Sequence, residues 1–135
     1  ILTASFLSYP VFRTLSLQLH SAVTGSYLSS TYSVVFVNCP NEQIARDIAR
    51  AILDKKLAAS VNILPMASSL YFWNGEIKEA TEFLLLIKTK TSKVRMLSSY
   101  IRFMHPFEVP EVFSLPMDQG DVRYLKWLDE GTGED

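Results

Sequence analysis

The chain has 135 residues, with 48% hydrophobic and 20% charged side chains and a formal net charge of −1 at pH 7. This is the composition of one globular domain, and the near-neutral charge argues against strong non-specific binding to nucleic acid. A single cysteine, Cys39, excludes an internal disulfide framework and a cysteine-only zinc site. Two histidines, His20 and His105, limit metal and acid–base chemistry.

Residues 1–31 differ from the rest, because they are rich in Ser and Thr and the first acidic residue is Glu42. This composition predicts either a disordered extension or a targeting leader. Pro10, Arg13 and His20 interrupt its apolar runs, so no integral membrane span is expected. The compartment is expected to be cytoplasmic or mitochondrial, with a secretory or membrane-associated form if the segment is a leader.

The domain itself is expected over residues 32–128. Residues 31–37 are β-branched and aromatic, which predicts a buried strand. Pro40 or Asn41 is then expected to begin a helix over residues 42–56, where apolar side chains recur at helical spacing.

Asn74 and Gly75 separate two long apolar runs, and Asn-Gly is a strong hairpin signal because both residues tolerate a positive φ. The arms are expected over residues 58–73 and 76–88, longer than the usual strand of about five to six residues. Pro65 predicts a bulge or a kink in the first arm.

Thr91 or Ser92 is expected to cap a second helix that Pro106 ends. A strand is predicted over residues 109–115, and Pro110 within it favours a sheet edge.

Asp121 is expected to open a short final helix, and residues 129–135 are expected to form a polar tail. The resulting order, β-α-β-β-α-β-α, predicts an α+β fold. Its topology is the ferredoxin-like split βαβ sandwich with a long β-hairpin and an extra C-terminal helix.

The run from Phe83 to Ile87 is apolar at every position, whereas a strand with one solvent-facing side should alternate apolar and polar residues. Both faces of this strand are therefore expected to be buried. Another copy of the same chain is the expected cover, and the overlong hairpin points the same way, since free strand edges are usually protected. These two features predict a homo-oligomer.

The sequence contains no phosphate-binding loop, dinucleotide fingerprint, HExxH motif or GxSxG motif. Cys39 and His105 together allow either a Cys/His catalytic pair or a soft-metal site, for example for Cu(I). The alternatives are that Cys39 is a small core residue and that His105 caps a helix end.

Two aromatic pairs suggest a ligand pocket between subunits. Tyr71 and Trp73 share a strand face, and Tyr124 and Trp127 share one side of the last helix. Alternatively, these rings belong to the core and to subunit contacts. The predicted pocket residues are Tyr71, Trp73, Lys88, Glu111, Tyr124 and Trp127.

Six segments, in order along residues 32–128, resemble the CutA divalent-cation-tolerance family. They are residues 38–50, 56–65, 69–77, 86–89, 105–111 and 120–128. The version Asn-Cys-Pro-Asn-Glu at residues 38–42 is most similar to the animal branch of the family.

The resemblance implies a non-enzymatic homotrimer, similar to the PII signalling proteins, with a link to divalent cations and to copper in particular. In bacterial members the copper site is associated with positions that match Cys39 and His105. Met104 stands where some of them carry a second histidine, which favours Cu(I), and Ser60 stands where the family often has a cysteine. We therefore expect no required cofactor and weak binding of copper or another divalent cation.

The resemblance also implies partners. The chain itself is one, as a homotrimer, and animal members are associated with membrane anchoring of acetylcholinesterase. The alternative function is a signalling or scaffold trimer that binds a small ligand or a partner protein at clefts between subunits. No nucleic-acid partner is expected.

Overall fold

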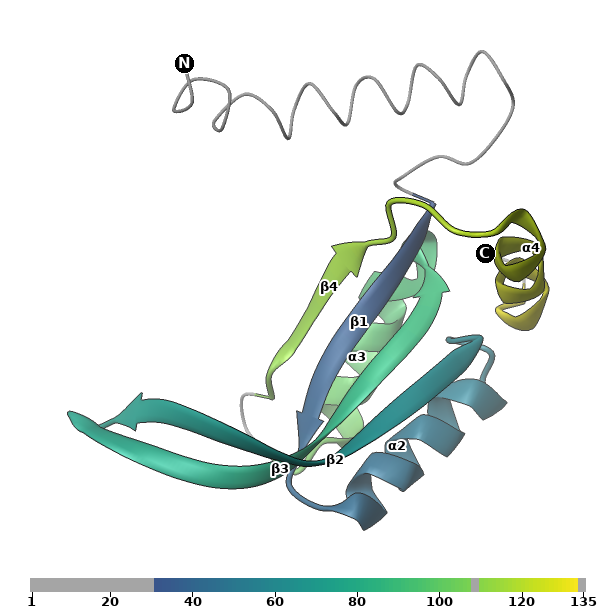
Figure 1. Ribbon diagram of the computed structural model, residues 1–135. Helices are drawn as coiled ribbons and strands as arrows, with labels where there is room; N and C mark the ends of the chain where they lie inside the picture. Colours follow the sequence, from purple (N-terminus) through teal and green to yellow (C-terminus); the bar gives the residue numbers. More distant parts are fainter. Residues whose placement is uncertain (1–30, 108–109, 134–135) are drawn as a thin grey trace, which may run out of the picture.

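The computed structural model describes residues 31–107 and 110–133, which form a four-stranded antiparallel sheet with helices packed against it (Figure 1). The strand order is β2-β3-β1-β4. The elements are β1 (Tyr32–Cys39), α2 (Glu42–Asp54), β2 (Ser60–Trp73), β3 (Glu76–Lys90), the 3-10 helix η1 (Thr91–Lys93), α3 (Val94–Met104), β4 (Val112–Pro116) and α4 (Val122–Gly131). The expected α+β, ferredoxin-like split βαβ architecture is confirmed.

The leader or extension expected at residues 1–31 lies outside the described residues, apart from Thr31, and so does His20. None of the helices in the described part of the chain is both long and apolar enough to cross a bilayer.

Helix α2 begins as its sequence predicts. The side chain of Asn41 accepts a hydrogen bond from the backbone N–H of Ile44 at 2.9 Å, which satisfies one of the free donors of the first turn. The helix ends at Asp54, two residues earlier than expected, because Lys56 adopts a left-handed φ of 57°.

The hairpin of β2 and β3 turns at Asn74 and Gly75, whose φ angles are 51° and 77°. These values are those of the tight hairpin turn that Asn-Gly favours. The strand register shifts between Leu64 and Ala67, where Pro65 predicts a bulge or a kink. This irregularity bends the long hairpin out of the sheet (Figure 1).

The expected caps of α3 are wrong. Residues 91–93 form a 3-10 turn instead, and the N-cap of α3 is Lys93, which makes no side-chain capping hydrogen bond. The hydroxyl of Thr91 bonds that of Ser33 at 2.7 Å, so it joins the end of β3 to β1. The helix ends at Met104, before Pro106 as predicted.

Strand β4 is an edge strand, as Pro110 predicts, but it begins at Val112 rather than at residue 109. Residues 108 and 109, which precede β4, lie outside the described residues.

Helix α4 is capped by Asp121, whose carboxylate accepts a hydrogen bond from the Arg123 N–H at 2.8 Å. It continues past the expected domain end at residue 128 to Gly131. Thr132 is fully buried, and its hydroxyl donates to the Leu128 carbonyl at 2.9 Å. The expectation of a polar tail is therefore wrong for residues 129–133, which belong to the folded domain.

The core lies between the sheet and the helices α2 and α3. One face of β1 and β3 supplies Val35, Val37, Leu85 and Ile87, and the helices supply apolar side chains that include Ile48, Ile52, Leu97 and Ile101. Each of these side chains is almost completely buried within the single chain.

The opposite face of the sheet, which we call the open face, is apolar as well. Phe36 pairs with Leu86 on β3 and with Phe113 on β4, and the rings of Phe36 and Phe113 stack at 5.0 Å. Leu115 is 51% exposed on the same face. Helices α2 and α3 pack against the other face, and α4 meets the open face at Lys90 through the ion pair with Asp129. The non-alternating run at residues 83–87 is therefore apolar on a side that its own chain covers incompletely.

Thr132→Val tests whether the C-terminal segment is part of the fold. Loss of the buried hydroxyl–carbonyl hydrogen bond is expected to lower the free energy of unfolding by about 1 kcal/mol in urea titrations at fixed protein concentration. Thr81→Val, at an exposed strand position, is the control and should change little. Equal stability of both variants would show that the segment is a dispensable tail.

Candidate functional site

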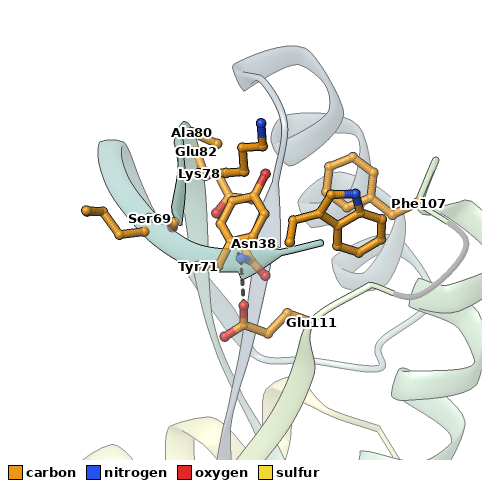
Figure 2. A pocket seen from close by; sticks show the side chains of 10 residues that line it. Asn38, Ser69, Tyr71, Lys78, Ala80, Glu82, Phe107 and Glu111 are labelled. Carbon is orange, nitrogen blue, oxygen red and sulfur yellow. Dashed lines mark hydrogen bonds between the residues drawn. The ribbon is translucent and has the colours of Figure 1, made fainter. Parts of the chain in front are cut away.

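An open cavity lies between the hairpin, the end of β1 and the segment around Glu111 (Figure 2). Its volume is about 760 Å³, within the range of roughly 300–1,000 Å³ typical of small-molecule sites. It is lined by Asn38, Ser69, Leu70, Tyr71, Trp73, Lys78, Ala80, Glu82, Phe107 and Glu111. We call it the hairpin cavity.

The amide of Asn38 joins three segments at one wall of the hairpin cavity. Its Nδ2 donates to Glu82 Oε1 at 3.1 Å and to Glu111 Oε2 at 2.8 Å, the second bond being drawn in Figure 2. Asn38 is the second-last residue of β1, and Glu82 precedes the apolar run of β3. The other amide atom, Oδ1, is buried without a hydrogen-bond partner.

Glu82 is 8% exposed, which is unusual for a carboxylate because burying an ionised group costs free energy unless it is paired. Within residues 31–107 and 110–133 it forms no ion pair, and the Asn38 amide is its hydrogen-bond donor. The wall therefore carries a buried, incompletely compensated negative charge.

Aromatic rings and one lysine complete the lining. Tyr71 and Trp73 lie on one strand face, as predicted, and Trp73 is 63% exposed. Lys78 pairs across the hairpin with Tyr71, and its Nζ contacts Glu76 Oε2 at 3.0 Å. Phe107 follows α3, and its ring packs against that of His105 with centroids 4.8 Å apart.

The structure brings together three of the six predicted pocket residues, Tyr71, Trp73 and Glu111. Lys88 lies further along β3, opposite Ser60, and its Nζ donates to Asn62. Burial lowers the pKa of Lys88.

Tyr124 and Trp127 stack on one side of α4 with ring centroids 5.9 Å apart, as their spacing predicts, but they do not line the hairpin cavity of the same chain. A pocket that unites them with the hairpin across two subunits stays a prediction.

Sequence reasoning missed Asn38, Glu82 and Phe107. Glu82 could have been found from its place in the alternation of β3, since it shares the open face with Leu84 and Leu86. A carboxylate in such a position is a signal of function rather than of solvation.

His105 uses both ring nitrogens in structural hydrogen bonds. The Phe107 backbone N–H donates to Nδ1 at 3.2 Å, so Nδ1 is unprotonated, and Nε2–H donates to the Asn38 carbonyl at 2.7 Å. The ring is thus a neutral bridge between the end of α3 and the end of β1. A metal ion at His105 would have to displace one of these bonds.

Cys39 is fully buried at the end of β1. Burial, and secondarily the charge of Glu82, raises the pKa of its thiol to about 11. The thiol is therefore protonated at neutral pH, whereas metal binding and nucleophilic attack both need the thiolate. In residues 31–107 and 110–133, no group of three or more His, Cys, Asp and Glu side chains is arranged to hold a metal ion. The copper site at Cys39 and His105 stays a prediction.

The α+β sandwich with split βαβ topology and a long protruding hairpin defines this chain as a ferredoxin-like domain. The family model described as CutA1 divalent ion tolerance protein matches residues 33–131. The chain belongs to this family.

Relatives are found among animals, plants and bacteria. A protein CutA homolog of Danio rerio is 50% identical over 132 residues, which cover 98% of this chain and 88% of that protein. A solved structure described as a divalent cation tolerance protein of Thermus thermophilus has a TM-score of 0.73 and 44% identity, over 76% of this chain and 99% of that chain. The crystal structure of CutA1 from Oryza sativa has a TM-score of 0.76 and 38% identity, over 79% and 98% of the two chains.

The thiol of Cys39 should make stability fall at alkaline pH. The thiol has its ordinary pKa of 9.0 in the unfolded chain and a pKa of about 11 in the folded protein. The contribution of the protonated thiol to the free energy of unfolding is therefore complete below pH 9 and is lost as pH rises towards 11. Relative to Cys39→Ala, the natural protein should lose up to about 2 kcal/mol of unfolding free energy over this window. Alkylation of the native thiol near neutral pH as fast as in urea would contradict the burial.

Proposed function

We propose that the chain acts as a non-enzymatic homotrimer in divalent cation tolerance. Its family membership and the related Thermus protein, described as a divalent cation tolerance protein, support the role. The observation that carries the proposal is the apolar open face of the sheet, because a monomer in water would leave it exposed.

The open face supports assembly on physical grounds. Phe113 and Leu115 are about half exposed, and Phe36, Leu84 and Leu86 are incompletely covered by their own chain. Contiguous apolar surface of this kind marks interaction sites. The two free sheet edges, β2 and β4, differ from each other, so pairing one with the other is head-to-tail and can close into a ring of three.

The non-enzymatic assignment has its own support at Cys39 and His105. A Cys/His catalytic pair needs a thiol that ionises near neutral pH and an imidazole with a free nitrogen. Here the thiol has a pKa of about 11, and the imidazole bridges two backbone groups.

The hairpin cavity favours a second candidate, a trimer that binds a small ligand at a cleft near the subunit boundary. The cavity continues the open face at its hairpin end, because Glu82 and Asn38 share that face with Leu84 and Leu86. An acetylcholinesterase-anchoring partner, suggested by resemblance to animal CutA proteins, stays a prediction.

Leu115→Asp tests the trimer. Placing a charge in an apolar interface should weaken assembly by roughly 100-fold or more, while the monomer tolerates it because the side chain is half exposed. Light scattering across a dilution series should show dissociation at concentrations where the natural protein remains trimeric. Met96→Asp, at a 62% exposed site on the helix layer, is the matched control and should stay assembled. Dissociation by both variants, or by neither, would contradict the proposed interface.

The metal prediction is weak binding at Cys39 and His105 with no structural role. Treatment with EDTA should leave the assembly and its melting temperature unchanged. Cu(I) binding, measured by competition with a chromogenic chelator, should strengthen as pH rises towards 11, because the thiol must lose its proton. Cys39→Ser should remove this binding. Dissociation in EDTA would show that a metal ion holds the trimer together.

A further inference from the structure

We propose that the hairpin cavity binds a protonated organic amine, whose ammonium group lies against Glu82 and Glu111 and whose carbon skeleton lies along the aromatic rings. This inference rests on the second candidate function, ligand binding near the subunit boundary, and it names the chemical class of the ligand.

The polar wall offers acceptors and negative charge. The Asn38 amide satisfies one oxygen of each carboxylate, and the second oxygens accept no hydrogen bond from the described residues. A charge-assisted N–H donor is the complement of this arrangement.

The cavity has little positive charge of its own to neutralise these groups. Among its lining residues the one cation is Lys78, against the carboxylates of Glu82 and Glu111. The Lys78 ammonium contacts Glu76 instead, a residue outside the lining. In Figure 2 it points away from the Asn38 amide. The buried charge of Glu82 therefore lacks the ion-pair partner that buried carboxylates normally have.

Aromatic faces supply the rest of the recognition. Tyr71, Trp73 and Phe107 all line the cavity while between 42% and 63% exposed, so their rings are available to a ligand. Aromatic faces attract cations through their quadrupoles and bury apolar carbon well. Carboxylates together with such rings suit an ammonium carried on an apolar skeleton better than an anion or a neutral polar molecule.

A metal ion fits the same wall less well. Carboxylate and carbonyl oxygens are suitable ligands for hard divalent cations. However, the position between Glu82 and Glu111 is taken by the Nδ2 group of Asn38, which donates to both. Because Nδ2 of Asn38 donates to both Glu82 and Glu111, the Oδ1 atom of the same amide is turned away from the position between the two carboxylates. A metal ion would have to expel a hydrogen-bond donor, whereas an ammonium can use the free oxygens.

The ammonium could also belong to a lysine of a neighbouring copy of the chain. Both sources present the same ammonium group. They can be distinguished because a free amine binds reversibly to the assembled protein. A neighbour's lysine would leave no room for it and would make the assembly itself depend on Glu82 and Glu111.

Isothermal titration of the full chain with phenethylamine, at low ionic strength and neutral pH, tests the inference. The neutral isostere 2-phenylethanol is the ligand control. We expect phenethylamine to bind at least about tenfold more tightly than the alcohol, since a charged hydrogen bond is worth more than a neutral one. Glu82→Gln and Glu111→Gln should each weaken amine binding by roughly tenfold and leave alcohol binding unchanged.

Glu79→Gln is the matched protein control, because Glu79 is an exposed carboxylate of the same strand outside the cavity lining. It should leave amine binding unchanged. Glu111 is exposed, so its variant keeps the test valid if Glu82→Gln does not fold.

Equal binding of the amine and the alcohol would overturn the inference, as would amine binding that is insensitive to both glutamine variants. Binding of MnCl₂ that the same variants abolish, without amine binding, would assign the wall to a metal. Dissociation of the assembly by Glu111→Gln, with no amine binding to the natural protein, would assign it to a neighbouring copy. Light scattering on the same samples reports the trimer separately, so a monomeric protein would count against the assembly and not against the ligand.

Discussion

The structure depends on a sheet that is apolar on both faces, of which α2 and α3 cover one. Burial of Val35, Val37, Leu85 and Ile87 against α2 and α3 holds the single chain together. Apolar side chains on the open face of the same strands are only partly covered within the chain. The stabilisation from hydrophobic burial is roughly proportional to the apolar area removed from water, so the open face would add to stability only if copies of the chain associate through it.

The hairpin links the open face to the candidate site. The irregularity at Pro65 bends β2 and β3 away from the helices, and the distal strands then carry Tyr71 and Trp73 beside the end of β1 (Figure 1). Asn38 ties this region together by bonding carboxylates from two other segments. His105 holds the backbone of Asn38 in place through the hydrogen bond from its Nε2 to the Asn38 carbonyl. A residue predicted as a metal ligand thus acts in this structure as a support for the wall of the cavity.

The parts of the fold that were predictable are those with local signals. Asn74-Gly75 specifies its turn through positive φ angles, and Asn41 and Asp121 cap their helices through side-chain hydrogen bonds. The site was less predictable, since it depends on which elements meet in space. Spacing placed Tyr124 and Trp127 on one side of a helix correctly, but the position of α4 follows from long-range contacts, such as the ion pair of Lys90 with Asp129 at 3.5 Å.

The central claim is that the open face is an interface between copies of this chain, and native mass spectrometry of the unmodified protein tests it most directly. The chain has a mass of 15.3 kDa, so the account predicts one dominant species of three times this mass at low micromolar concentration, unchanged by chelators. A dominant 15.3 kDa species under the same conditions would mean that the apolar face is stable in water. That result would contradict the account.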